Sequence, residues 1–152
     1  MSTESLTIAT PLAISAWVCV AASAGIIFSL GILHLGLTFH GTSFAPRDRA
    51  LLAQMKHAYP DITRQTTVWR AYVGFNASHS LGAVMFGVFY GDLAIAHGSV
   101  LFGSSFLSLF GLFCLICYAV LARFYWFSRP FQAIVAATIL YGVGLIFALA
   151  AT

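Results

Sequence analysis

Residues 69–92, WRAYVGFNASHSLGAVMFGVFYGD, decide the fold class of this chain. Arg70 marks one end of the stretch and Asp92 the other, and about 20 apolar residues suffice to span a bilayer. Asn76 and His79 nevertheless lie near its middle. At about 1.5 Å per helical residue, His79 lies roughly 15 Å from Trp69, near the centre of a hydrocarbon core about 30 Å thick. A spanning helix that keeps an imidazole and an amide at this depth uses them for packing or for chemistry.

The composition agrees with a membrane protein. Of the 152 residues, 61% are hydrophobic and only 7% are charged, whereas a soluble domain carries roughly 25% charged residues. The net charge of +3 does not indicate a nucleic-acid partner, because the basic residues lie at span ends and in one loop. The three cysteines, Cys19, Cys114 and Cys117, all fall in apolar segments, so a disulfide scaffold is not expected.

Three further apolar runs accompany this stretch. We expect spans over residues 12–39, 68–91, 99–124 and 131–151, which form a single membrane domain over residues 1–152. The short turns after the second and third spans force antiparallel neighbours. The sequence therefore predicts an all-α fold, an integral membrane four-helix bundle with up-down-up-down topology.

The long connection over residues 40–67 contains a short helix of its own. Pro46 can open this helix and Pro60 can end it. Its apolar side chains share one face and its basic side chains lie largely elsewhere, which is typical of an amphipathic helix in the headgroup region. The apolar face consists of Leu51, Leu52, Met55 and Tyr59.

The basic residues predict the orientation. Five of the seven Lys and Arg residues lie from His40 to Arg70, and the other two lie between the third and fourth spans. Both connections are on the same side of a four-span chain. The positive-inside rule therefore places the loop 40–67 in the cytoplasm and both termini outside.

Two faces of small residues suggest where helices approach closely. On the first span this face comprises Gly25, Ser29, Ile32 and Gly36, and on the second span small residues recur every four positions. Small residues at this spacing let the backbones of two membrane helices come together. The repeat on the second span consists of Gly74, Ser78 and Gly82.

A polar cleft is expected where the first two spans meet. If these spans are neighbours, His34, Asn76 and His79 face one cavity in the cytoplasmic half of the bundle. Tyr72 from the second span and Tyr118 from the third can complete it. The alternative is plain packing, since intramembrane hydrogen bonds contribute about 0.6 kcal/mol each on average. The predicted ligand-binding residues are His34, Tyr72, Asn76, His79 and Tyr118.

Metal and cofactor sites are less favoured by the sequence. His34 and His79 on different helices can be considered as axial ligands of a b-type haem, but their expected depths differ by roughly 6 Å. There is no CxxCH haem-attachment motif. No acidic residue stands at a ligand spacing with the histidines, so no metal site is predicted. The expectation is a chain with no cofactor.

Part of the chain resembles a known family. Residues 44–56, Ile62-Thr63-Arg64 and the segment WRAYVGFNASHSLG at 69–82 resemble a family of small, uncharacterised bacterial membrane proteins with four predicted spans. The pattern WRxxxGFNxSHSLG is the most specific part of the likeness, which covers about the middle third of the chain. The resemblance implies the four-span fold and a bacterial membrane, and it implies no catalytic residues.

These observations favour a binding or accessory protein in the lipid bilayer, which holds a small apolar or amphipathic ligand, or a partner subunit of a larger complex. One alternative is an enzyme on a lipid-like substrate, with His79 as acid or base and Asn76 as an orienting donor. Another is a purely structural small subunit. The sequence leans away from the enzyme.

Overall fold

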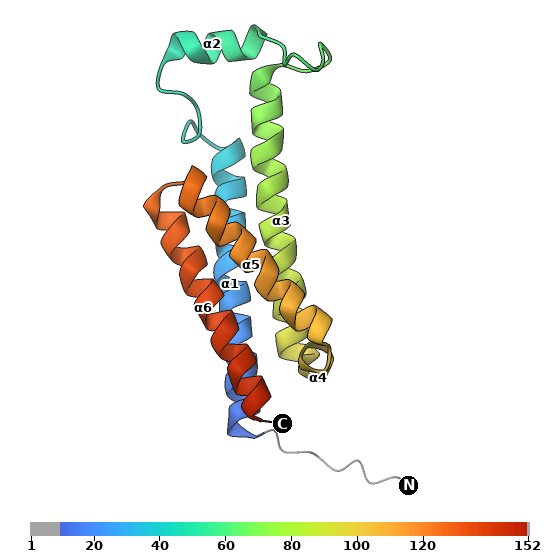
Figure 1. Cartoon of the computed structure of the whole chain (residues 1–152). Coiled ribbons are helices and arrows are strands. Elements are labelled where there is room, and N and C mark those ends of the chain that lie inside the picture. Colours follow the sequence, from blue (N-terminus) through green and yellow to red (C-terminus); the bar gives the residue numbers. More distant parts are fainter. Residues whose placement is uncertain (1–9, 152) are drawn as a thin grey trace. The chain divides into compact units, whose positions relative to one another are not determined.

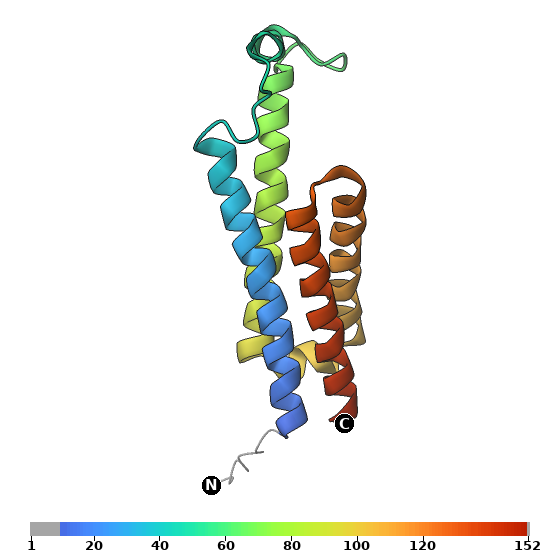
Figure 2. The same ribbon diagram turned by 90° about the vertical axis from the view of Figure 1, so that its left-hand side faces the viewer.

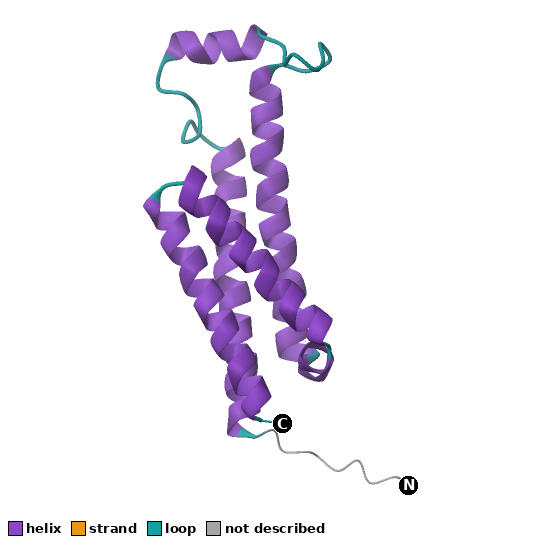
Figure 3. Ribbon diagram, viewed as in Figure 1, coloured by secondary structure: helices purple, strands orange, loops and turns teal. Residues whose placement is uncertain are grey.

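The computed structural model describes residues 10–151, which form six helices and no strand (Figures 1 and 3). The expected all-α fold is therefore confirmed for this part of the chain. The polar segment around Glu4, and with it the predicted location of the N-terminus, lies outside the described residues. The helices are α1 (Pro11–Phe39), α2 (Arg49–His57), α3 (Val68–Ala96), α4 (Gly98–Gly103), α5 (Ser105–Tyr125) and α6 (Ser128–Ala150).

Four of these helices are long and apolar enough to cross a membrane, so the chain is a multi-pass membrane protein. They are α1, α3, α5 and α6, and the mean hydropathy of their most apolar windows is 2.2, 1.3, 2.3 and 2.3. The value for α3 is the lowest, and this helix carries both the polar run Asn76-Ala77-Ser78-His79-Ser80 and Asp92.

The helix expected over residues 99–124 is instead two helices. Ser104 has an extended backbone (φ −109°, ψ 106°), and its hydroxyl accepts a hydrogen bond from the Leu107 N–H at 3.3 Å, so it caps the start of α5. The Ser108 hydroxyl donates to the carbonyl of Leu101 at 2.9 Å and joins the two pieces. The prediction of one continuous helix was wrong. The segments on both sides of Ser104 are largely apolar, so hydropathy alone gave no sign that Ser104 caps a new helix.

The short helix between Pro46 and Pro60 is present as α2. Asp48 caps it, accepting hydrogen bonds from the N–H groups of Ala50 at 2.8 Å and Leu51 at 3.3 Å. No residue of α2 is buried. At the start of α3, the Thr67 hydroxyl accepts from the Arg70 N–H at 3.3 Å.

The chain divides into two compact units. The first unit combines Met1–Ile27 with Phe86–Thr152, and the second unit is Phe28–Met85. The helices α1 and α3 contribute a segment to each unit, whereas α4, α5 and α6 belong to the first unit alone.

The first unit is a helical bundle in which hydrogen bonds join the helices. The hydroxyl of buried Ser23 on α1 donates to the carbonyl of Ala137 on α6 at 2.7 Å. The α5 and α6 helices lie side by side in both views (Figure 2), and the Tyr141 hydroxyl donates to the Ser108 carbonyl between them at 3.2 Å. The Tyr90 hydroxyl of α3 donates to a carbonyl of α5, that of Leu107, at 3.0 Å.

Gly111 of α5 lies against the two tyrosine rings of this core. A Cβ atom at this position would lie 2.6 Å from Cε1 of Tyr90 and 2.7 Å from Cζ of Tyr141. The rings of Tyr90 and Tyr141 meet edge to face, with their centroids 5.7 Å apart. A glycine at 111 therefore leaves the space that the two aromatic side chains fill.

In the second unit, α1 and α3 approach most closely at Gly31. A Cβ atom there would lie 2.9 Å from the backbone nitrogen of Val84 and 3.0 Å from the carbonyl oxygen of Ser80. At Gly36 and Gly74, by contrast, an added Cβ would meet no described side chain within 4 Å. The small-residue faces that include Gly36 and Gly74 are thus not where these two helices pack in this unit, and the approach of another helix to these faces stays a prediction.

Candidate functional site

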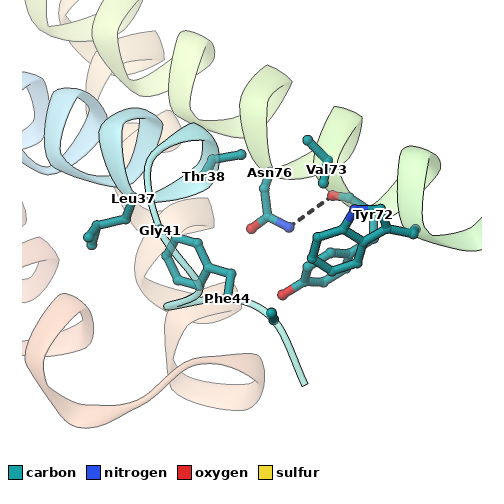
Figure 4. Close-up of a pocket in the computed structure, with 9 residues that line it drawn as sticks. Leu37, Thr38, Gly41, Phe44, Tyr72, Val73 and Asn76 are labelled. Atoms are coloured by element: carbon teal, nitrogen blue, oxygen red, sulfur yellow. Dashed lines mark hydrogen bonds between the residues drawn. The ribbon is translucent and has the colours of Figure 1, made fainter. Parts of the chain in front are cut away.

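The polar residues expected to share a cavity are joined within the second unit. His34 of α1 and Asn76 of α3 form a hydrogen bond, with 3.0 Å between Nε2 and Oδ1. The Asn76 side chain also donates from Nδ2 to the carbonyl oxygen of Tyr72, one turn earlier in α3, at 2.9 Å (Figure 4). These two contacts fix both ends of the amide.

The amide orientation determines where His34 carries its hydrogen. Because Nδ2 of Asn76 donates to a carbonyl, Oδ1 is the end that faces His34, and this oxygen can only accept. Nε2 of His34 is therefore the N–H donor. In the neutral imidazole this leaves Nδ1 as the acceptor nitrogen.

Aromatic rings hold the His34 imidazole on two sides. It stacks on Phe44 with ring centroids 4.5 Å apart and planes inclined by 28°. It meets His79 edge to face, with centroids 5.5 Å apart and an interplanar angle of 74°. The Thr38 hydroxyl donates to the backbone carbonyl of His34 at 2.8 Å.

A pocket opens beside the Asn76 amide and lies entirely within the second unit. It encloses about 250 Å³ of space, which includes open solvent at its mouth. Figure 4 shows Phe44 on one side of the pocket and Tyr72 on the other, with the Asn76 side chain between them. The lining residues are Leu37, Thr38, Gly41, Phe44, Ala45, Trp69, Tyr72, Val73 and Asn76.

The pocket is aromatic and carries no charged side chain in its lining. Trp69 and Tyr72 stack on each other, with ring centroids 5.7 Å apart and planes inclined by 28°. Within residues 10–151, neither the Trp69 indole N–H nor the Tyr72 hydroxyl makes a hydrogen bond. The lining therefore offers ring surfaces and a few neutral polar groups.

Four of the five predicted site residues lie in this part of the second unit. His34, Asn76 and His79 are in mutual contact through one hydrogen bond and one ring contact, and Tyr72 lines the pocket with Asn76. Tyr118 lies on α5 in the first unit, so its part in the same site stays a prediction.

Sequence reasoning missed Phe44, which both stacks on His34 and lines the pocket. Gly41 has φ +117°, a conformation that side chains other than glycine rarely adopt, and it lies in the turn between α1 and Phe44. A glycine followed by an aromatic residue just beyond a span end was the available signal.

Other candidate groups form no such site. Among residues 10–151, no group of three or more His, Cys, Asp or Glu side chains is arranged to hold a metal ion. Asp92 and His97 form a pair, with 3.1 Å between Oδ2 and Nδ1, and both side chains are exposed. Cys114 and Cys117 are free thiols.

No protein-family model, curated protein or solved structure matches this chain at a significant level. Its function is therefore inferred from the geometry of the site.

Proposed function

We propose that this chain is an integral membrane binding or accessory protein that holds a small apolar or amphipathic ligand in the pocket beside Asn76. The observation that carries the proposal is the fixed amide at an open aromatic pocket. Ligand sites combine mostly apolar walls with a small number of oriented polar groups. His34 and the Tyr72 carbonyl supply that orientation before any ligand arrives.

The size of the pocket favours part of a larger molecule as its occupant. The space within it that admits a water-sized sphere is only about 20 Å³, far below the roughly 300–1,000 Å³ of pockets for drug-sized ligands. The pocket therefore admits only a small group at one end of a ligand. The remainder of an amphipathic ligand can lie on the exposed apolar surface nearby, where Phe39 is 61% exposed.

The site is proposed to lie on the cytoplasmic side of a bacterial inner membrane. Its walls come from the last turns of α1, the first turns of α3 and the connection between them. That connection carries most of the basic residues of the chain. The positive-inside rule supports a cytoplasmic loop and both termini outside.

A second candidate is a structural subunit of a larger membrane complex. It is supported by the faces at Gly36 and Gly74, where an added Cβ would meet no described side chain. Small residues on an open helix face suit the close approach of another membrane helix. On this proposal the protein would be unstable when extracted without its partner.

An enzyme on a lipid-like substrate is the further alternative, with His79 as acid or base and Asn76 as the orienting donor. It is supported by the ring contact between His79 and His34. It predicts that His79→Gln abolishes turnover of a lipid-like substrate while the protein stays folded.

The first test is native mass spectrometry of the gently extracted protein, with an absorption spectrum of the same sample. One stoichiometric extra mass is expected, and it should be lost from His34→Ala and Asn76→Leu. The matched control is His97→Ala, an exposed histidine of the first unit. A bare protein, or one that carries only a partner polypeptide, would contradict the ligand.

The same spectrum tests for haem. His34 and His79 are in direct ring contact, and His34 is stacked on Phe44, so a macrocycle between the two imidazoles would have to part them. We therefore expect no Soret band.

A further inference from the structure

We infer that the group held in this pocket is a positively charged alkylammonium, either the head group of a lipid or a free quaternary amine. The inference rests on the proposed function, because it names the ligand class of the same site. It follows from the charge, the hydrogen-bonding state and the ring content of the pocket lining.

The lining has no positively charged side chain to hold an anion. None of its nine residues is a lysine or an arginine. Anions in proteins are held by such side chains or by the N–H groups at a helix N-terminus. The walls of this pocket come from the C-terminal turns of α1, the connection and the first turns of α3. At the start of α3, the N–H groups of Val68, Arg70 and Ala71 are already bonded, to the carbonyl of Ala58 and to the hydroxyl and carbonyl of Thr67.

The polar lining offers acceptor atoms as well as the donor groups of Trp69 and Tyr72. The single hydroxyl hydrogen of Thr38 is donated to the His34 carbonyl, so its oxygen presents only lone pairs to a ligand. Asn76 has one amide hydrogen committed to the Tyr72 carbonyl. The lone pairs of Thr38 are attractive to a positive charge, as is the one lone pair of Asn76 Oδ1 that does not accept from His34.

The rings supply the main attraction. Trp69, Tyr72 and Phe44 all line the pocket, and the face of an aromatic ring carries partial negative charge. A cation within about 6 Å of a ring centroid gains from about 0.5 kcal/mol at exposed sites to about 2 kcal/mol when desolvated, with tryptophan the best partner. Trimethylammonium groups are recognised in this way.

The position of the pocket fits such a ligand. Trp and Tyr are enriched at the membrane–water interface, where lipid head groups lie. Trp69 and Tyr72 occupy the first turns of α3, next to the polar connection that precedes it. Both a lipid head group and a small soluble amine can reach a pocket placed there.

The decisive experiment separates charge from shape. Choline and its neutral isostere, in which carbon replaces nitrogen, are titrated into the full-length protein in a neutral detergent, and binding is followed by tryptophan fluorescence. We expect choline to bind roughly tenfold more tightly, which corresponds to about 1.4 kcal/mol of cation–π attraction. Equal or tighter binding of the isostere would overturn the inference and leave an apolar ligand site in place.

Substitutions of the aromatic residues in the lining test whether choline binds at their rings. Trp69→Leu should weaken choline binding roughly tenfold, and Trp69→Phe should weaken it less. Phe44→Leu, which lies in the connection between α1 and α3, should also weaken choline binding. The matched control is Phe75→Leu on the same helix, since Phe75 is 76% exposed and does not line the pocket. Loss of binding in the control alone, or in none of the variants, would refute the assignment.

Native mass spectrometry then identifies the source of the ammonium group. The protein is reconstituted with equal amounts of phosphatidylcholine and phosphatidylglycerol. Retained phosphatidylcholine that choline does not displace indicates a lipid head group, and displacement indicates a free amine. Preferential retention of phosphatidylglycerol would overturn the inference. If no lipid, choline or isostere binds and nothing co-purifies, the proposed function itself fails.

Discussion

The imidazole of His34 and the amide of Asn76 form a hydrogen bond of 3.0 Å that joins α1 to α3. The two residues are far apart in the sequence, and the connection between them contains α2. Because the Asn76 amide is also tied to its own helix, the pair orients the polar wall of the pocket. This bond is therefore a suitable target for a measurement of stability.

Removing the His34–Asn76 bond should cost little stability but show clear coupling. In a double-mutant cycle of His34→Ala and Asn76→Ala, we expect a coupling energy of about 0.6 kcal/mol, the average for hydrogen bonds between membrane helices. Equilibrium unfolding in mixed micelles measures it. Ser78→Ala is the control, because the Ser78 hydroxyl bonds only within α3, to the Phe75 carbonyl. A coupling of zero would show that the contact does not stabilise the fold.

Gly31 and Gly36 should respond oppositely to the same substitution. Gly31→Ala places a Cβ atom 2.9 Å from the Val84 backbone and should destabilise the second unit by about 1–3 kcal/mol. Gly36→Ala adds a methyl group that meets no described side chain, so it should be neutral or stabilising by up to about 1 kcal/mol. The free energy of unfolding of the two variants is compared directly. Equal effects would argue against close packing at Gly31.

Gly111→Ala should destabilise the core of the first unit, again by about 1–3 kcal/mol, because the new methyl group collides with Tyr141 and Tyr90. The nearest atom to the added Cβ is the Tyr141 hydroxyl oxygen. Tyr141→Phe in the Gly111→Ala background should therefore recover part of the loss, although the same change alone removes a hydrogen bond to the Ser108 carbonyl. Thermal unfolding, followed by circular dichroism, gives the stability of the wild type, the two single variants and the double variant. Purely additive effects would contradict the steric account.

Ser23→Ala tests the hydrogen bond between α1 and α6. Its hydroxyl is fully buried and donates to the Ala137 carbonyl at 2.7 Å, so its loss should cost about 0.6–1.7 kcal/mol. Ser15→Ala is the control on the same helix, since the Ser15 hydroxyl bonds only to Pro11 of its own helix. The measurement is again the free energy of unfolding. A larger loss for the Ser15 variant would contradict the assignment.

The fold was largely predictable because long apolar runs leave few alternatives. The ends of α1 and α6 lie within a few residues of their expected positions. The break at Ser104 was not predictable from hydropathy, since a single serine hardly changes the average of an apolar run. Its effect depends on a hydrogen bond to Leu107, and a serine within a membrane helix can bond to its own backbone without breaking it.

The helix faces were harder to predict than the helices. Gly31 is the close-contact glycine, although the regular spacing of small residues pointed to the opposite face of α1, at Gly36. Periodicity shows which residues share a face, but the face that is used depends on the partner. At the site, the helix face shared by Tyr72, Asn76 and His79 was enough to predict that α3 contributes to the pocket. Phe44 could not be predicted in this way, because it reaches the pocket only through the turn at Gly41.

The lack of any buried residue in α2 has a practical consequence. Its side chains can change without leaving a void or an unpaired polar group elsewhere. A short epitope or a reactive cysteine introduced in Arg49–His57 should leave the protein intact and report, by its accessibility to reagents added on either side of a sealed vesicle, which side of the membrane this connection occupies. Because α2 buries no residue, it is a suitable place for a label that maps the membrane topology of the chain.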